Sequence, residues 1–174
     1  MKQGLLHIYC GDGKGKSTAA VGLAVRALGS GMKVLFCQCM KNGTSSEVAM
    51  LKKLGASYCC CEEKFGFYWN MKEEEKERAA CAYTCLFQTV ADRAKKEGVD
   101  LLVIDEFMSA YNHNLLDQEI ALSFLKNRPQ GLEVVLTGRD PAPALLELAD
   151  YVSEVCKKKH PYDKGIPARR GIEL

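Results

Sequence analysis

The sequence predicts an α/β fold, in which a mostly parallel β-sheet has helices on both faces and so forms three layers. Short apolar runs alternate along the chain with longer stretches of helical periodicity, which is typical of parallel strands joined by helical crossovers. The length of 174 residues is that of one domain, and the sequence shows no linker, internal repeat or low-complexity segment. We therefore expect a single domain over residues 1–174.

The expected strands are short apolar segments bounded by glycine, polar or charged residues. Their order along the chain, with a helical stretch between most of them, is the pattern of a parallel sheet. We expect strands at residues 5–10, 33–39, 101–105, 132–137 and 151–155, and a further one at residues 57–61.

The expected helices have recognisable ends. Gly29 and Gly31 end the first, while Asn70 and Glu73 resemble a capping box at the start of the third and longest, which Gly98 ends. An apolar stripe at helical spacing marks that third helix, formed by Ala79, Ala80, Tyr83, Leu86, Phe87, Val90, Ala91 and Ala94. We expect helices at residues 17–28, from about residue 46, from about residue 70, at 117–126 and at 142–149.

Composition describes a soluble globular protein, with a net charge of +2 and 47% hydrophobic residues. The first residues lead directly into the first expected strand, and no apolar run reaches membrane length, so we expect a cytoplasmic protein. The nine cysteines are then expected to be free thiols. Cys37 and Cys39, and the run 59–61, lack the two spaced pairs typical of zinc sites, so no structural metal is expected.

A glycine-rich run between the first strand and the first helix predicts a phosphate-binding loop. Glycines let backbone N–H groups turn inward on an anion, and the start of a helix adds partial positive charge. Lys16 is expected to reach a terminal phosphate, and the Ser17 hydroxyl to complete a Mg²⁺ shell. Cys10 stands where the motif Gly-x-x-x-x-Gly-Lys-Ser has its first glycine. The expected nucleotide-binding residues are Gly11, Asp12, Gly13, Lys14, Gly15, Lys16, Ser17 and Thr18.

Other interpretations of this run are less favourable. The dinucleotide motif Gly-x-Gly-x-x-Gly fails because Lys16 stands where its third glycine is required, and residues 34–39 offer no acid for a ribose. A plain glycine turn would not require two lysines among three glycines.

Two further strand ends are expected at the same edge of the sheet. Asp105 and Glu106 follow a buried strand, and the carboxyl ends of parallel strands meet at the ligand crevice. One carboxylate can hold Mg²⁺ and the other can orient water or a substrate, and the sequence leaves open which does which. Arg139 follows the next strand and is expected to reach a phosphate or the second substrate.

The carboxyl-terminal residues 157–170 hold six Lys or Arg and one acidic residue. A nucleic-acid surface is one interpretation, but the only aromatic residue there is Tyr162, so no nucleic-acid partner is expected. The units Gly165-Ile166 and Gly171-Ile172 favour an ordered loop over a disordered basic tail.

Together these residues resemble the ATP:corrinoid adenosyltransferase family of the P-loop type. The resemblance covers nearly the whole chain, and its most specific part is the carboxyl-terminal signature. It rests on residues 11–20, on Asp105-Glu106, on residues 136–139, on residues 149–154, on residues 159–162, on residues 165–168 and on residues 171–173.

Membership of this family implies a RecA-like α/β fold, a homodimer, and transfer of the 5′-deoxyadenosyl group of ATP to the cobalt of a reduced corrinoid with release of inorganic triphosphate. Co(I) is itself a strong nucleophile and needs no side chain to deprotonate it. Lys16, the loop amides and Mg²⁺ would stabilise the leaving triphosphate, and Arg139 is the second expected catalytic residue. The Gly-Glu that the family has after its second strand reads Ser46-Glu47 here.

The resemblance also implies that the corrinoid loses its lower axial ligand and that Co(II) accepts an electron from a flavodoxin-like donor. Aromatic residues near the cobalt would favour the four-coordinate state, and the candidates are Phe65, Phe67, Tyr68 and Trp69. Longer members carry an amino-terminal extension that helps to cover the site, whereas this sequence starts at its first strand.

Two other classes of function fit the phosphate-binding loop. In a P-loop phosphotransferase such as a nucleoside kinase, Asp105 or Glu106 would activate a hydroxyl, and an arginine-rich lid would cover the phosphates. The basic carboxyl-terminal residues are the only candidate lid, and their glycine-isoleucine units fit the adenosyltransferase better. A nucleotide-dependent switch with little turnover is the third hypothesis.

Overall fold

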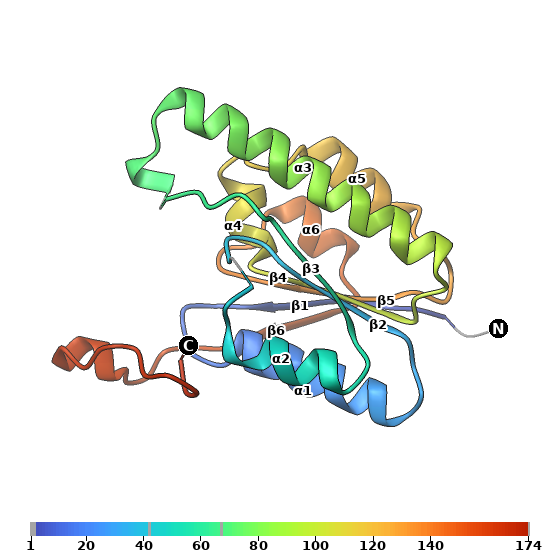
Figure 1. The fold of residues 1–174 in the computed structure, drawn as a ribbon, viewed down its shortest axis with the longest axis horizontal. Helices are drawn as coiled ribbons and strands as arrows, with labels where there is room; N and C mark the ends of the chain where they lie inside the picture. The colour runs from blue at the N-terminus through green and yellow to red at the C-terminus, as the bar shows by residue number, and fades with distance from the viewer. Residues whose placement is uncertain (1–2, 42, 67, 174) are drawn as a thin grey trace.

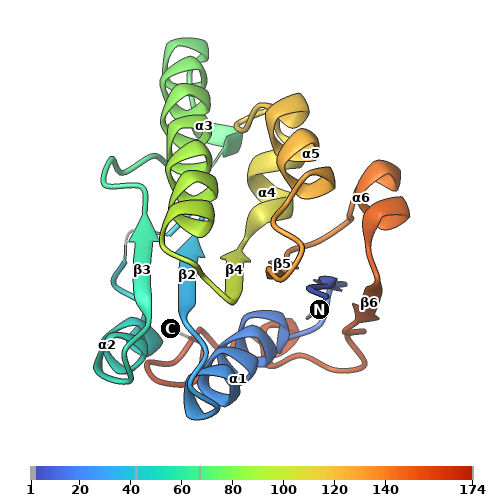
Figure 2. The same cartoon turned by 90° about the vertical axis from the view of Figure 1, so that its right-hand side faces the viewer.

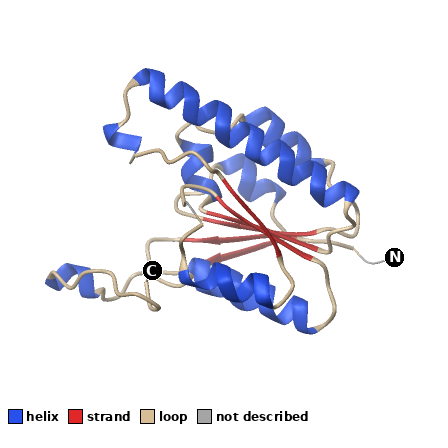
Figure 3. Cartoon of the chain, viewed as in Figure 1, coloured by secondary structure: helices blue, strands red, loops and turns tan. Residues whose placement is uncertain are grey.

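The computed structural model describes residues 3–41, 43–66 and 68–173 and shows a six-stranded sheet between two layers of helices (Figures 1 and 3). All strand pairs are parallel, and the strand order is β3-β2-β4-β5-β1-β6. The strands are β1 (Leu6–Cys10), β2 (Val34–Gln38), β3 (Ser57–Cys60), β4 (Leu101–Asp105), β5 (Glu133–Thr137) and β6 (Tyr151–Glu154). The predicted strands are confirmed, and each end lies within one residue of its expected position.

Two helices cover one face of the sheet and four cover the other (Figures 1 and 2). The first layer holds α1 (Lys16–Gly29) and α2 (Ser46–Lys53). The second holds α3 (Glu73–Lys96), α4 (Phe107–Asn112), α5 (Gln118–Lys126) and α6 (Pro143–Leu148). Short 3₁₀ helices occur at η1 (Tyr68–Asn70) and η2 (Pro161–Lys164). None of the described helices combines the length and the apolar character that a membrane span requires.

Alternation along the strands divides the core into two clusters. Leu35, Leu102 and Val134 point toward the layer of α3, while Phe36 and Val103 pack on the alanines of α1. These side chains are almost completely buried, and each buried Leu or Phe contributes about 2 kcal/mol of transfer free energy. The apolar stripe predicted for the third helix is confirmed, since its buried residues are Ala79, Tyr83, Phe87, Val90, Ala91 and Ala94.

The predicted start of the third helix is wrong. Asn70 is the last residue of η1, and α3 begins at Glu73 behind Lys72, which makes no side-chain capping bond. A capping box has its acidic residue at the third helical position, whereas Glu73 is the first residue of α3. The helix start is favoured by the three acidic residues of its first turn, whose charge suits the helix dipole.

The strand order brings the functional loops to one end of the molecule. β5 lies between β1 and β4, so the loop after β1 and the acidic end of β4 are separated by one strand. Because all strands are parallel, their carboxyl ends face the same way, toward the left of Figure 1. The helix after β1, α1, covers one face of the sheet, whereas the helix after the neighbouring β5, α6, covers the other (Figure 1). Such a switch point leaves a crevice for a ligand.

Candidate nucleotide and corrinoid site

The glycine loop after β1 is shaped by contact with the chain that follows β6. A Cβ atom on Gly11 would lie 2.5 Å from the carbonyl oxygen of Val155, and one on Gly13 would lie 2.7 Å from it. The Gly13 N–H donates to that same oxygen at 2.7 Å. Gly11 also has a φ of 101°, which side chains rarely adopt. Glycine at these positions therefore fixes a tight loop that leads directly into α1.

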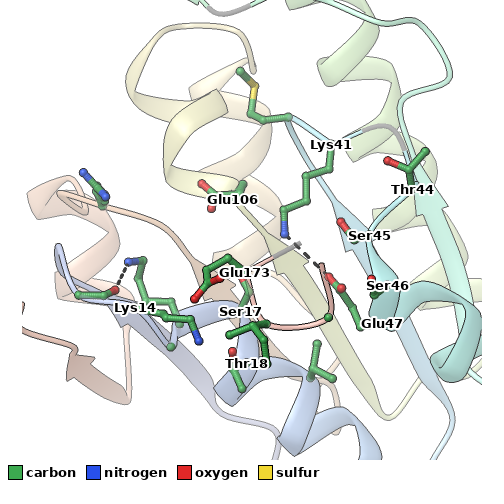
Figure 4. Close-up of a pocket in the computed structure, with 18 of the residues that line it drawn as sticks. Lys14, Ser17, Thr18, Lys41, Thr44, Ser45, Ser46, Glu47, Glu106 and Glu173 are labelled. Carbon is green, nitrogen blue, oxygen red and sulfur yellow. Dashed lines mark hydrogen bonds and ion pairs between the residues drawn. The ribbon is translucent and has the colours of Figure 1, made fainter. Parts of the chain in front are cut away.

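The loop forms one wall of a cleft of about 970 Å³. Figure 4 shows side chains that reach this cleft from the loop and α1, from the segment after β2, and from the carboxyl-terminal residues. The lining includes all of the predicted nucleotide-binding residues except Gly11, together with Arg139 and Glu106. It also includes Met40, Lys41, Thr44, Ser45, Ser46, Glu47, Glu63, Lys64, Phe65, Tyr83, His160, Gly171, Ile172 and Glu173.

Asp105 lies completely buried beneath the cleft. One carboxylate oxygen accepts a hydrogen bond from the Thr137 hydroxyl at 2.6 Å. The other accepts from Lys41 Nζ at 2.9 Å and from Gln38 Nε2 at 3.2 Å. Burial alone would raise the pKa of Asp105, but the Lys41 ammonium and the hydrogen bonds from Thr137, Lys41 and Ser17 outweigh it and hold that pKa below its usual value. Asp105 is thus a carboxylate whose ionised form is satisfied by protein donors.

Glu106 has a different environment although it is the next residue. Its φ of 57° is left-handed, and this turn sends its side chain into the cleft rather than the core (Figure 4). Its N–H donates to the Thr137 hydroxyl oxygen at 3.0 Å, and Ser109 donates to its Oε2 at 3.0 Å. Thr137 therefore contacts both acidic residues, and Glu106 is the one that lines the cleft.

Three of the cations that line the cleft are Lys16, Arg139 and Lys41. Lys16 Nζ donates to the Gly13 carbonyl at 2.8 Å, and Arg139 lines the same cleft. Burial, and then the charge of Arg139, hold the pKa of Lys16 below its usual value. Like charges that converge in this way favour a polyanion between them. The backbone of Arg139 is held by Asn112 Nδ2, which donates to its carbonyl oxygen at 3.3 Å and to that of Asp140 at 2.9 Å.

The third cation, Lys41, belongs to a network that the sequence did not reveal. Its ammonium lies 2.9 Å from Asp105 and 3.9 Å from Glu47. Gln38 Nε2 donates to Glu47 at 2.9 Å, and its Oε1 accepts from the Tyr58 hydroxyl at 2.9 Å. Gln38 lies at the carboxyl end of β2 and Lys41 lies just beyond it. Like Asp105, they are therefore at the edge of the sheet where the carboxyl ends of the parallel strands meet.

The segment of residues 157–173, called here the carboxyl-terminal segment, forms the outer wall of the cleft. It begins where the Lys157 N–H donates to Asp12 at 2.8 Å. It ends at Glu173, which accepts from Arg169 Nη2 at 3.0 Å and points into the cleft (Figure 4). Hydrogen bonds from the side chain and the backbone N–H of Arg169 lower the pKa of Glu173 to about 2, and the charge of Lys14 is a smaller cause. Both ends of the segment thus contact or face the glycine loop after β1, called here the phosphate loop.

Comparison with known proteins shows the family of the chain. The sequence model of the family described as ATP:corrinoid adenosyltransferase BtuR/CobO/CobP matches residues 2–174. The chain belongs to this family. It is 36% identical over 178 residues to a corrinoid adenosyltransferase of Pseudomonas aeruginosa, covering 99% of this chain and 85% of that protein. It is 34% identical over 174 residues to corrinoid adenosyltransferases of Escherichia coli K12 and Salmonella typhimurium, covering 99% of this chain and 86% of each.

A structural comparison supports the same fold. The chain is similar to EssC (ATPases 2 and 3) from Geobacillus thermodenitrificans, with a TM-score of 0.50 and 15% sequence identity. The likeness covers 98% of this chain and 36% of that one, and it concerns the fold alone. The expected three-layer α/β fold, with a parallel sheet and helices on both faces, is confirmed.

The aromatic residues expected near the corrinoid of this adenosyltransferase-family chain fall into two groups. Phe65 lines the cleft and lies against Tyr83, with ring centroids 5.7 Å apart. Tyr68 stacks on His113 at 4.2 Å, and Trp69 packs edge-on against the same imidazole while remaining 78% exposed. Phe67 lies outside the described residues.

The nine cysteines, all within the described residues, are free thiols. Among residues 3–41, 43–66 and 68–173, no group of three or more His, Cys, Asp or Glu residues is arranged to hold a metal ion by itself. Mg²⁺ in nucleotide sites is commonly held by one or two protein oxygens together with phosphate oxygens. The chemistry of the donors fits that role, since the Ser17 hydroxyl and the Glu106 carboxylate both line the cleft.

Proposed function

We propose that this chain transfers the 5′-deoxyadenosyl group of ATP to the Co(I) of a reduced corrinoid and releases inorganic triphosphate. The observation that carries the proposal is the convergence of Lys16, Lys41 and Arg139 on one cleft in a chain of the adenosyltransferase family. Phosphate-binding cations that surround a cleft favour a triphosphate there. In this proposal the triphosphate is the leaving group, not the donor of a phosphoryl group.

The bond changes require little acid–base chemistry from the protein. An electron pair of Co(I) forms the bond to C5′, and the bond between C5′ and its oxygen breaks. The electron pair of the broken bond stays on the oxygen and leaves with the triphosphate. Negative charge therefore develops on the bridging oxygen. Lys16, Arg139 and the N–H groups of the loop stabilise that charge, because they are held in place before the reaction begins.

Magnesium would be held by Ser17 and Glu106 together with phosphate oxygens. When bound, Mg²⁺ neutralises part of the phosphate charge. Asp105 would act indirectly, because its oxygens already accept from Thr137, Gln38 and Lys41 and its hydrogen bond from Ser17 orients that hydroxyl. The acidic pair is thus divided between a metal ligand, Glu106, and a positioning residue, Asp105.

We also propose the partners that the resemblance implies. A flavodoxin-like protein would reduce Co(II) on the enzyme, the exposed Trp69 would lie near the corrinoid, and the chain would act as a cytoplasmic homodimer. Sedimentation analysis would give a mass of twice 19.2 kDa for the homodimer, and a mass of 19.2 kDa would contradict it.

The test is anaerobic incubation of the protein with ATP, Mg²⁺ and a corrinoid under strong reductant. We expect a light-sensitive adenosylated corrinoid and inorganic triphosphate in equal amounts, with the spectrum of the corrinoid and ion chromatography as the two readouts. ADP as the sole nucleotide product would overturn the proposal in favour of phosphoryl transfer. Absence of any product from a folded protein would also overturn it.

A further inference from the structure

Lys41 is a charged residue of the cleft whose task is not explained by the phosphate loop. Its side chain is 29% exposed, and it extends from the end of β2 into the cleft (Figure 4). Lys16 reaches the same space from α1. The two ammonium groups therefore come from different elements of the fold.

The simplest role for Lys41 is to neutralise the buried carboxylate of Asp105. That role leaves part of Lys41 unexplained, because other residues also donate to this carboxylate and the ammonium has more donors than the ion pair requires. Thr137 and Gln38 donate to it at 2.6 and 3.2 Å, and Ser17 donates to it as well. An ammonium group has three N–H donors, and the ion pair with Asp105 requires one of them. Glu47, at 3.9 Å, is too far away to accept another.

The position of Lys41 points to a second role. Lys41 and Ser17 both hydrogen-bond to the Asp105 carboxylate, so the ammonium lies within roughly 8 Å of the Ser17 hydroxyl, because at most two hydrogen bonds and one carboxylate group separate them. Ser17 belongs to the first turn of α1, where the loop presents its N–H groups to an anion. A phosphate held by the loop would therefore be within reach of Lys41.

We propose that Lys41 is a third phosphate-binding cation, which contacts the triphosphate from the β2 side of the cleft while Asp105 and Ser17 hold it in position. The proposal rests on the proposed function, because it assigns the ligand of the same cleft. Lys41 would touch the substrate and is a catalytic residue, whereas Asp105 acts through it and through Ser17 and is a positioning residue.

The experiment must separate phosphate binding from neutralisation of Asp105. Lys41→Met alone would leave a buried carboxylate without its cation, which is destabilising. The decisive pair is therefore Asp105→Asn and the double variant Asp105→Asn/Lys41→Met, which share an uncharged residue at position 105 and differ only at Lys41. Titration calorimetry measures the binding of inorganic triphosphate to each in EDTA, so that no metal contributes.

We expect the double variant to bind triphosphate about 10- to 100-fold more weakly than Asp105→Asn, as the loss of a charge-assisted contact predicts. Lys41→Arg should retain most of the affinity, and Lys53→Met, on α2 outside the cleft, should match the unmodified protein. Equal affinities of Asp105→Asn and the double variant would overturn the proposal.

Failure of the proposed function has a different signature. If the unmodified protein forms no adenosylated corrinoid, the proposed function is wrong whatever the calorimetry of the variants shows. If it is active while Asp105→Asn and the double variant bind triphosphate equally well, only the role of Lys41 is wrong.

Discussion

The two sides of the cleft are built in opposite ways. Its floor, formed by Gln38, Asp105 and Thr137, comes from three neighbouring strands and is completely buried. Its outer wall, the carboxyl-terminal segment, is exposed over almost its whole length. Side-chain hydrogen bonds such as Arg169 to Glu173 link residues within the segment, and Asp12 fixes its start.

This difference teaches which changes should harm the fold and which should harm only binding. A change in the floor leaves a buried polar group without a partner, and the penalty is paid in the free energy of unfolding. A change in the wall alters exposed contacts, which contribute little to stability, but it alters the shape of the cleft. The phosphate loop has features of both, because it packs on the Val155 backbone and also lines the cleft.

The largest expected effect is at the loop. Lys16→Ala should lower the rate of adenosyl transfer by about 10³-fold or more, because a fixed cation at the leaving triphosphate is lost. The unfolding curve in urea should stay near that of the unmodified protein, because the only described hydrogen bond of the Lys16 side chain is the one to Gly13. Substantial activity in a folded Lys16→Ala protein would show that the loop does not hold the triphosphate.

The next effect is in the floor. Thr137→Val should lower the free energy of unfolding by about 3 kcal/mol, because it removes the donor to Asp105 and the acceptor for the Glu106 N–H. Thr137→Ser keeps the hydroxyl and should lose much less. Urea denaturation measures both, and a Val variant as stable as the Ser variant would contradict the division between floor and wall.

Alanine substitutions at two glycines compare the crowded loop with the open surface of α1. Gly13→Ala should destabilise the protein by about 1–3 kcal/mol and weaken ATP binding, because its Cβ would lie 2.7 Å from the Val155 carbonyl oxygen. Gly22→Ala, within α1, meets no heavy atom within 4 Å and should stabilise the protein by about 0.5–1 kcal/mol. Similar effects of the two substitutions would mean that the loop is not held against Val155.

The wall should respond differently. Arg169→Ala removes the two hydrogen bonds that the Arg169 guanidinium donates to Glu173. The end of the segment is then less well held before ATP binds, and binding must order it. We expect the KM for ATP to rise about three- to tenfold while the midpoint of urea unfolding stays unchanged. Lys158→Ala, in the same segment and outside the cleft, is the charge-matched control. If Arg169→Ala lowered the midpoint of urea unfolding and Lys158→Ala did not, the segment would contribute to the stability of the fold, which would contradict this expectation.

The smallest effect appears only in acid. The pKa of Asp105 is below its usual value, so its charged form adds stability that is fully present above the pKa of the unfolded chain. That stability is lost as the pH falls through the folded pKa, which places the loss below about pH 4. The unmodified protein should therefore lose stability more steeply there than Asp105→Asn, and parallel pH profiles would contradict the account of the floor.

The sequence predicted the sheet well, because apolar alternation and the glycine loop are local signals. It did not predict α4, whose six residues are too few to show a helical period and follow the strand without a break. The sequence also could not show which of Asp105 and Glu106 is buried and which lines the cleft. That difference depends on the left-handed turn at Glu106 and on Thr137, which is 31 residues away from Glu106 in the chain.

Lys41 and Gln38 were missed for a different reason. Both lie at or just beyond the carboxyl end of β2, but neither is acidic, and their network with Asp105 forms only when β2 and β4 pair. The wall was predicted to be ordered, but its contacts with the phosphate loop join residues 145 positions apart. Long-range contacts of this kind leave no local pattern in one sequence.

The most direct test of the central claim follows the oxygen between C5′ and the α-phosphorus of ATP. ATP labelled with ¹⁸O at this bridging position is incubated with the protein and a Co(I) corrinoid, and the products are separated and analysed by mass spectrometry. Attack at C5′ predicts that all of the label leaves with inorganic triphosphate and that none remains on the adenosyl group. Label retained in ADP or in any nucleoside product would show that the bond broken is a phosphorus–oxygen bond, which would contradict the account.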